Sequence, residues 1–308
     1  MSGPRFGVFL SPHVEGLPQL TEKAQAAEST GFDYVSIQDH PYVPHYVDTF
    51  TLIAHLATTT SRIRLMTNVA NLPLRPAPML AKTSASIDLL SGGRFELGLG
   101  GGRAWDQIAG LGGPRWSPGE TVAATSEAID TIRALWTADR VLNVSDGHYP
   151  LIDAASGPPP AHRIGIWLGA AGPRMLNLLG AKADGWIAPL ATAFDTKPAA
   201  QDRIDAAARA AGRQPTDIHR VIQLVGLIDG ATASRPRTGR GNTPIHANAE
   251  SWAQIITEFV TDERFDTINF VPQSESVDQV RHFGDDVIPR VRAALQDRQR
   301  DRPGAPPR

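Results

Sequence analysis

An aspartate and a histidine stand side by side at positions 39 and 40, directly after an apolar run at 34–38 that is typical of a β-strand. Imidazole titrates near neutral pH, so His40 could move a proton, and Asp39 could bind a polar ring beside it. Pro41 and Pro44 stiffen the loop that follows, which favours a preorganised site. A solvated loop histidine is the plainer interpretation, and the sequence leaves both open.

A second strand-like run, at 95–99, ends in three glycines at 100–102. Glycines after a strand often let the backbone approach a phosphate group. The dinucleotide fingerprint G-x-G-x-x-G does not fit here, because Arg103 or Trp105 stands where its last glycine is needed. The missing side chains could instead leave room for a flat ring or an anionic tail, or they could serve a tight turn.

Two further loops carry groups that bind polar ligands. The run at 63–68 is followed by hydrogen-bonding side chains, which could equally be simple turn chemistry. The run at 164–169 is followed by small residues at 170–172, then by Pro173, which suits a first helical turn, and by Arg174. Free N–H groups at a helix N-terminus bind anions, although an ordinary capped helix explains the pattern as well.

The elements that must position these loops alternate along the whole chain. Eight apolar runs are separated by helical patterns, with no break in composition between them, which predicts a closed (β/α)8 TIM barrel. We expect one domain over 1–296, a flexible polar insertion at 230–247 after the seventh strand, and a disordered tail at 297–308. The expected strands are 5–10, 34–38, 63–68, 95–99, 164–169, 185–188, 218–228 and 267–271.

Composition narrows the class of protein. The 308 residues carry a formal net charge of −2, so no global basic field recruits nucleic acid or anionic lipid. The chain has no cysteine, which excludes disulfides, thiolate catalysis and cysteine-ligated zinc. No apolar run approaches the ~18 residues of a membrane span, and the N-terminus lacks the pattern of a secretory signal. These features predict a cytoplasmic protein without membrane or nucleic-acid partners.

Taken together, the motifs resemble those of the bacterial luciferase-like superfamily of flavin and deazaflavin oxidoreductases. The resemblance rests on "AAESTGFDYVSIQDH", "LSGGRFELGLGGG", "AIDTIRALW…GHYPL" and "IGIWLGAAGPRMLNLLGAKADGWI", which follow one another in the family's order. It implies a luciferase-like TIM barrel that is usually a homodimer and holds coenzyme F420 or FMN in its mouth. The region around Asp39 and His40 and the "GPRML" pattern are more similar to the F420-using branch.

The resemblance also implies roles for individual residues. His40 would be the catalytic residue that moves the proton, and Asp39 would contact the deazaflavin. A non-proline cis peptide would lie between Asn68 and Val69, and His13, Tyr42 and Trp105 would shape the substrate pocket. The arginines of the insertion would contact an acidic cofactor tail, or else belong to a solvated loop. The other expected cofactor contacts are Thr67, Asn68, Val69, Asn71, Gly101, Gly102, Arg103, Ala170, Ala171, Gly172, Arg174 and Met175.

Two departures from the sugar-phosphate dehydrogenases of this branch matter. Those enzymes have a glutamate where this chain has Arg103, and a tryptophan where it has Pro44 and His45. The sequence therefore argues against glucose 6-phosphate as the substrate. Arg103 could bind an anionic group or form a surface salt bridge.

The main hypothesis is hydride transfer between C5 of F420 and a small organic substrate. An FMN-dependent two-component monooxygenase, a non-catalytic deazaflavin-binding barrel and a metal-dependent hydrolase are the alternatives. The hydrolase is disfavoured because no His-x-His pair ends the first strand, and we expect no metal site.

Overall fold

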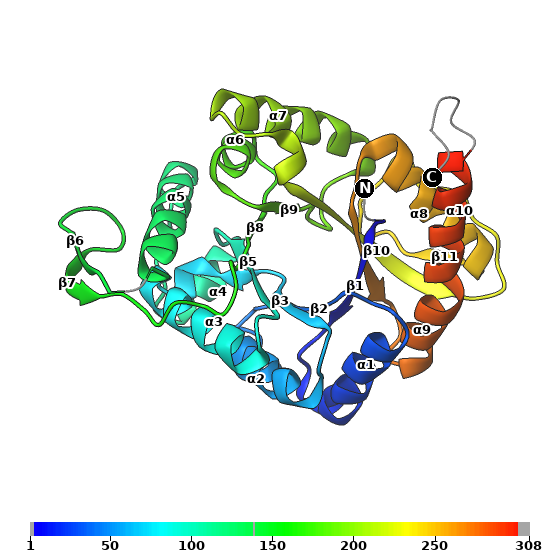
Figure 1. The fold of residues 1–308 in the computed structure, drawn as a ribbon, viewed down its shortest axis with the longest axis horizontal. Coiled ribbons are helices and arrows are strands. Elements are labelled where there is room, and N and C mark those ends of the chain that lie inside the picture. Colours follow the sequence, from blue (N-terminus) through cyan, green and yellow to red (C-terminus); the bar gives the residue numbers. More distant parts are fainter. Residues whose placement is uncertain (1–2, 138, 301–308) are drawn as a thin grey trace.

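The structure is a computed structural model that describes residues 3–137 and 139–300. Within them, eight parallel strands form a closed barrel surrounded by helices (Figure 1). The barrel closes where His219 of the tenth strand pairs with Gly185 of the ninth. This arrangement confirms the predicted (β/α)8 fold. The barrel strands are β1 (Arg5–Leu10), β2 (Tyr34–Ile37), β3 (Arg64–Thr67), β5 (Phe95–Gly100), β8 (Ile166–Gly169), β9 (Gly185–Ile187), β10 (His219–Ile228) and β12 (Thr267–Pro272).

Helices cover the outside of the barrel, and their ends follow local capping chemistry. Ser117 and Glu120 form a reciprocal capping box at the start of the fifth helix. The first helix ends just before Gly31, whose φ of 93° is the left-handed conformation expected of a helix terminator. The helices are α1 (Leu17–Ser29), α2 (Thr49–Thr59), α3 (Ala77–Ser91), α4 (Trp105–Gly110), α5 (Pro118–Leu135), α6 (Pro173–Lys182), α7 (Lys197–Ala210), α8 (Ala249–Glu263), α9 (Val277–His282) and α10 (Ile288–Arg300).

The core has two parts because strand side chains alternate between the barrel interior and the helices. Outward-facing residues such as Val35, Leu65 and Leu97 join the large apolar layer under the helices. Inside the barrel, Trp167 is 1 % exposed and packs with Met66 and neighbouring residues. A hydrogen-bonded polar group of Ser36, Asn68, Gln223 and Asn269 also lies inside. The interior is therefore a packed plug rather than a pore.

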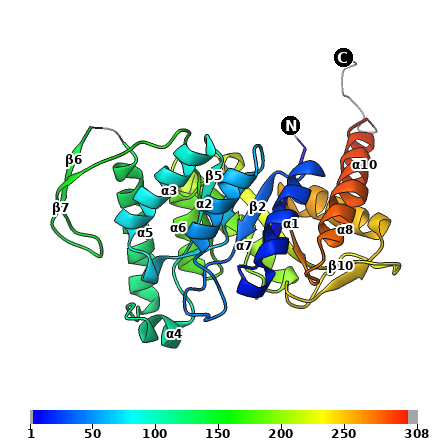
Figure 2. The ribbon, with the colours of Figure 1, turned by 90° about the horizontal axis from the view of Figure 1, so that it is seen from below.

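Two regions differ from the sequence-based expectation. A hairpin of β6 (Val141–Val144) and β7 (Leu151–Ala155) forms where the sequence predicts no strand, and it stands apart from the barrel in Figures 1 and 2. Its strands are short and largely solvent-exposed, so their sequence lacks a buried strand's apolar pattern. Residues 297–300, expected in the tail, continue α10. Residues 301–308 lie outside the described residues.

The insertion at 230–247 is partly tied to the barrel. Its last residues form β11 (Ile245–Ala247), which pairs in parallel with the end of β10. Arg235 is buried against α8, where it forms ion pairs with Glu258, Asp262 and Glu263. Neither expectation for this arginine, contact with a cofactor tail or solvation, fits that placement.

No helix among the described residues has the length and apolar character that crossing a membrane requires.

Candidate functional site

The carboxyl ends of the barrel strands form one rim, and most of the predicted site residues follow those ends. Asp39 and His40 follow β2, residues 101–103 follow β5, and residues 170–172 follow β8. α4, which begins close after β5, marks this side at the lower edge of Figure 2. Because the strands of the closed barrel are parallel, the loops that follow them meet at one end, although these loops are up to about 130 residues apart in the sequence.

His40 is half-buried at this rim, and its Nδ1 lies 2.7 Å from the hydroxyl oxygen of Tyr42. Burial lowers the pKa of His40, and the nearby Asp39 charge opposes that effect only in part. The pKa of Tyr42 is raised by burial and by Asp39, while the positive charge of Arg103 acts against the rise. The imidazole is therefore neutral near pH 7 and has a phenol beside it.

Asp39 makes contacts within the protein that the sequence did not predict, and its expected contact with the cofactor ring stays a prediction. The residue is 2 % exposed, and its two carboxylate oxygens accept hydrogen bonds from Nη2 and Nε of Arg75, at 2.8 and 2.7 Å. The backbone N–H of Asn71 donates a third, at 2.9 Å. Arg75 also pairs with Asp48 and lies over the ring of Phe50. These bonds fix the residue next to His40 to the segment that follows β3.

The peptide bond between Asn68 and Val69 is cis, at the position that the resemblance implies. The Asn68 side-chain amide donates a hydrogen bond of 2.8 Å to Gln223 Oε1 inside the barrel. The methyl groups of Val69 occupy the space next to Gly100 and Gly169, 2.6 and 3.2 Å from where their Cβ atoms would stand. The glycine at the end of β5 is thus required by this side chain.

Thr67 contributes no side chain to the rim. It is fully buried, and its hydroxyl donates 2.7 Å to the carbonyl oxygen of Gly98. This bond uses the hydroxyl proton inside the barrel wall, and the expected cofactor contact of Thr67 stays a prediction.

The glycines after β5 pack against protein atoms. A Cβ at Gly101 would meet Thr121 at 2.6 Å, and one at Gly102 would meet Pro73 at 2.6 Å. Gly102 also has a φ of 95°, which favours glycine. The space that their missing side chains leave is thus filled by neighbouring protein residues. The interpretation as a tight, closely packed turn fits better than room for a flat ring.

The start of α6 is open. Ala171, Gly172 and Arg174 are exposed, and nothing lies within 4 Å of a Cβ built at Gly172, which caps the helix without a side-chain bond. Ala170 differs, because it is 2 % exposed and its carbonyl oxygen accepts 2.9 Å from Trp186 Nε1. Met175 lies beside Gly101, so this helix start and the end of β5 are neighbours.

The three expected substrate-pocket residues lie in different settings. Tyr42 contacts His40, as described. Trp105 begins α4, next to Gly102 and edge-on to Trp116. His13 is exposed, and its ring lies edge-on to Tyr46, 4.7 Å between centroids. The described contacts do not join His13 to His40.

Two charged residues near the rim were missed from the sequence. Arg75, the partner of Asp39, follows a short helical turn and has no motif around it. Lys197 is 2 % exposed, donates to the carbonyl oxygens of Thr192 and Ala193, and has its pKa lowered to about 8, mainly by burial. It lines a small cavity that also includes Ala170 and Ala171. Only the three-dimensional arrangement identifies either residue.

Arg103 is exposed, and none of the ion pairs found in the described part of the chain involves it. The surface salt bridge that the sequence left open is therefore not seen there. The described residues also contain no group of three or more side chains arranged to hold a metal ion.

Residues 4–235 match the model of the family described as luciferase-like monooxygenase. A similar protein is the F420-dependent hydroxymycolic acid dehydrogenase of Mycobacterium tuberculosis, 34% identical over 245 residues, which covers 74% of this chain and 64% of that protein. Another is the F420-dependent glucose-6-phosphate dehydrogenase of Amycolatopsis mediterranei, 30% identical over 259 residues, with 80% and 76% covered. The 5,10-methylenetetrahydromethanopterin reductase of Methanolobus tindarius is 30% identical over 257 residues, with 83% and 71% covered.

The fold is similar to that of an F420-dependent secondary alcohol dehydrogenase solved with an F420–acetone adduct. The TM-score is 0.81, with 94% of this chain and 99% of that chain covered, at 19% sequence identity.

Proposed function

The chain belongs to the luciferase-like monooxygenase family and is an oxidoreductase, and from this premise we propose that it uses coenzyme F420 to transfer a hydride to or from a small organic substrate. The observation that carries the proposal is what the named relatives share. One relative is named for glucose 6-phosphate and another for hydroxymycolic acid, two compounds that are unlike each other. Both enzymes are nevertheless named as F420-dependent.

The rim residues fit such a cofactor. The side-chain oxygen of Asn71 is buried and has no hydrogen-bond partner among the described residues, so it can accept a bond from a ligand. The first turn of α6 presents backbone N–H groups and the exposed Arg174, which suit a phosphate. When bound, the deazaflavin supplies the hydride chemistry at its C5. Asn71 would orient the ring, and α6 would hold the phosphate.

His40 would carry the proton that accompanies the hydride. Its lowered pKa leaves it neutral near pH 7, so it can accept a proton when an alcohol is oxidised and return one in reverse. Tyr42 would hold the imidazole through the bond to Nδ1. Asp39, tied to Arg75 and Asn71, would act by holding these loops rather than by touching the ring.

Arg103 would face an anionic part of the substrate or cofactor. It is exposed next to Tyr42, near enough to act on the pKa of that phenol. The two sequence departures point away from glucose 6-phosphate, whereas the exposed Arg103 is compatible with any anionic group. The substrate class stays open among alcohols, activated alkenes, quinones and imines.

The test is a fluorescence and absorbance titration of the purified chain with F420 and with FMN. We expect saturable binding of F420 and much weaker binding of FMN. Turnover should then appear in a screen of oxidised F420 with alcohols or of reduced F420 with activated alkenes, quinones and imines. Tight FMN binding without F420 binding would overturn the proposal in favour of a flavin monooxygenase. F420 binding with no turnover in any screen would favour a non-catalytic barrel.

We also propose that the protein is a homodimer, through the outer face of α3. Met79, Leu89 and Leu90 on this helix are 59 %, 45 % and 73 % exposed, which is unusual for large apolar side chains on one helix. Light scattering of the wild type and of Leu90→Glu tests this, because the variant should become a monomer. A cytoplasmic location remains a prediction.

A further inference from the structure

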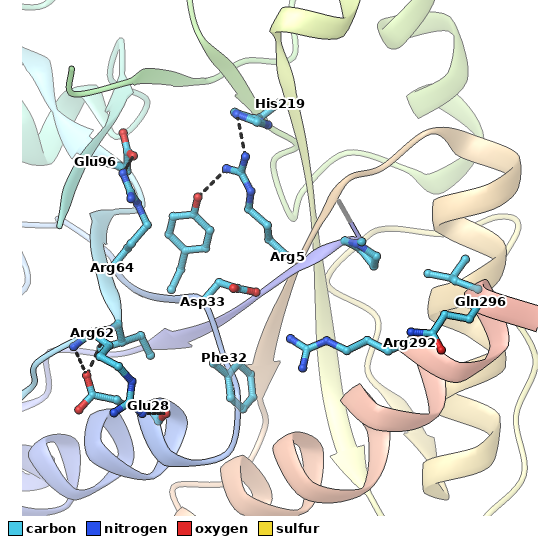
Figure 3. Close-up of a pocket in the computed structure, with 15 residues that line it drawn as sticks. Arg5, Glu28, Phe32, Asp33, Arg62, Arg64, Glu96, His219, Arg292 and Gln296 are labelled. Carbon is cyan, nitrogen blue, oxygen red and sulfur yellow. Dashed lines mark hydrogen bonds and ion pairs between the residues drawn. The ribbon is translucent and has the colours of Figure 1, made fainter. Parts of the chain in front are cut away.

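A cavity of about 920 Å³ lies at the opposite end of the barrel from His40, where the strands begin. Its volume falls in the ~300–1,000 Å³ range of pockets that hold small molecules. Figure 3 shows side chains from β1, β3, β5, β10 and α10 around it. None of the residues that the proposed function uses lines this cavity. The residues that carry charge here are Arg5, Glu28, Asp33, Arg62, Arg64, Glu96 and Arg292.

Arg5 is held by groups that do not neutralise it. Its Nη1 donates 2.7 Å to the hydroxyl of Tyr34, and its Nη2 lies 3.3 Å from Nε2 of His219. Burial raises the pKa of Tyr34, so the phenol stays uncharged. His219 stacks on Trp167, which fixes the imidazole plane. A guanidinium held by a phenol and an imidazole keeps its positive charge available to a ligand.

Arg62 and Arg292 are also without an ion pair in the described part of the chain. Arg62 is exposed, and its guanidinium donates to the carbonyl oxygen of Glu28. Arg292 reaches from α10 towards the middle of the cavity in Figure 3, donates to the carbonyl oxygen of Gly31 and lies over the ring of Phe6. Both keep further N–H donors that these carbonyl bonds do not use.

The carboxylates of the cavity are already occupied by other donors. Burial acts to raise the pKa of Glu28, but bonds from the backbone N–H groups of residues 61–63 and the positive charge of Arg62 lower it overall. Asp33 accepts 2.8 Å from the N–H of Phe6. Glu96 pairs with Arg64 at 2.6 Å and accepts from the N–H of Gly165. Backbone N–H groups carry no charge, so these bonds do not neutralise Glu28 or Asp33. The four arginines that line the cavity nevertheless outnumber its three carboxylates, and among the described residues no ion pair involves Arg5, Arg62 or Arg292.

From this arrangement we propose that the cavity is a second ligand site, which binds a small polyanion carrying phosphate or carboxylate groups. The guanidinium fork matches both groups in bidentate geometry. We call the end of the barrel where the strands begin the floor. The anion would be held there by Arg5 of β1, Arg62 before β3 and Arg292 of α10, and it would link the last helix to the barrel. Because this end lies away from the rim, occupation should not compete with the cofactor.

The experiment is calorimetric titration of the full chain with inorganic phosphate and, separately, with malonate, at constant ionic strength set by chloride and with F420 at saturation. F420 occupies the other candidate phosphate site at α6. The titration is repeated with Arg62→Gln/Arg292→Gln. The matched control is Arg281→Gln/Arg290→Gln, which removes the same charge from exposed arginines of α9 and α10 that do not line the cavity.

We expect saturable binding of phosphate, malonate or both by the wild type, and which of them binds identifies the anionic group. Affinity should fall by about tenfold or more in Arg62→Gln/Arg292→Gln and stay within about twofold in the control. Absence of saturable binding by the wild type, equal affinity in both double variants, or an equal loss in both would overturn the proposal. If the first double variant does not fold, Arg62→Gln alone is judged by the same criterion. A titration without F420 should give the same affinity of the cavity for phosphate or malonate. The result therefore does not depend on F420 binding, and a failure of the proposed function is recognised separately.

Discussion

The two ends of one barrel use different chemistry, and two histidines show the difference. His40, at the carboxyl end of the strands, is half-buried next to a phenol, and burial lowers its pKa. His162, at the other end, lies 2.7 Å from a carboxylate oxygen of Asp88 and 3.5 Å from one of Glu96, and these partners raise its pKa. Burial at the rim favours the neutral form of His40, whereas the carboxylates at the other end favour the charged form of His162.

The surroundings differ in the same way. At the rim, the open groups are mostly backbone N–H groups and short side chains, as at the start of α6. At the floor, side chains at the starts of neighbouring strands form ion pairs, as Arg64 and Glu96 do. A ligand at the rim therefore meets backbone dipoles together with the exposed Arg103 and Arg174, whereas one at the floor meets charges of both signs. From this comparison we propose that the rim carries the chemistry, and that the floor provides stability and an anion site.

The largest expected effect comes from His40→Ala. If His40 moves the proton, turnover should fall about 10²–10⁴-fold while F420 affinity is unchanged. Steady-state kinetics and fluorescence titration measure the two quantities. His55→Ala, an exposed histidine on the outside of α2, is the control and should keep full turnover. Turnover within twofold of the wild type in His40→Ala would remove the catalytic role of the rim.

The next effect concerns stability at the rim. Arg75→Met leaves the carboxylate of Asp39, whose side chain is 1 % exposed, without its charged partner. The loss should be about 3–5 kcal/mol in the free energy of unfolding, measured with urea. The exposed pair of Arg115 and Asp106 is the control, since Arg115→Met should cost less than ~1 kcal/mol.

Arg64→Met sharpens the comparison from the floor. Its partner Glu96 keeps the contact with His162 and the bond from the N–H of Gly165, so the carboxylate is left with two partners. We therefore expect a smaller loss of stability than for Arg75→Met. A larger loss of stability for Arg64→Met than for Arg75→Met would show that the other partners of Glu96 do not compensate for the missing arginine.

The sequence predicted the barrel because its strands are apolar on both faces and alternate with helices, a pattern that few other folds produce. It also located the rim, since loops after parallel strands must meet at one end. The resemblance placed the cis bond at Asn68–Val69.

Contacts between side chains distant in sequence could not be predicted in this way. Asp39 is an acid beside a histidine in the sequence, but its partner Arg75 is 36 residues away and turns it into a buried anchor. The glycines after β5 illustrate the same limit, because only the packing of Thr121 and Pro73 shows what fills their space. The floor cavity went unnoticed because its arginines stand at the starts of separate strands and helices, without any motif.

A smaller effect is expected at the phosphate end of the rim. Arg174→Gln should weaken F420 binding about tenfold, because it removes one charge-assisted contact and leaves the N–H groups of α6 in place. Thermal unfolding without ligand should stay within a few degrees of the wild type, since Arg174 is exposed. Arg163→Gln, an exposed arginine before β8, is the matched control for F420 affinity. Unchanged F420 affinity in Arg174→Gln would move the phosphate away from α6.

The smallest effect is the pH dependence of stability, and its sign is opposite for the two histidines. The pKa of His162 is raised above its ordinary 6.5 in the folded state, so its stabilisation is complete below 6.5 and is lost as the pH rises through the folded pKa. The pKa of His40 is lowered, so its contribution is complete above 6.5 and is lost as the pH falls through the folded value. Each contribution is worth about 1.4 kcal/mol per unit of pKa shift, less solvent screening.

Urea unfolding at several pH values between about 5 and 8, compared for the wild type, His162→Gln and His40→Gln, isolates these contributions. His162→Gln should lose more stability, relative to the wild type, at the acidic end of that range than at the alkaline end. His40→Gln should show the reverse, because the variant has no half-buried imidazole, whereas the wild type loses stability in acid as His40 must be kept uncharged. Parallel pH curves for the two variants would mean that rim and floor do not differ electrostatically, and the contrast between a neutral rim histidine and a charged floor histidine would have to be given up.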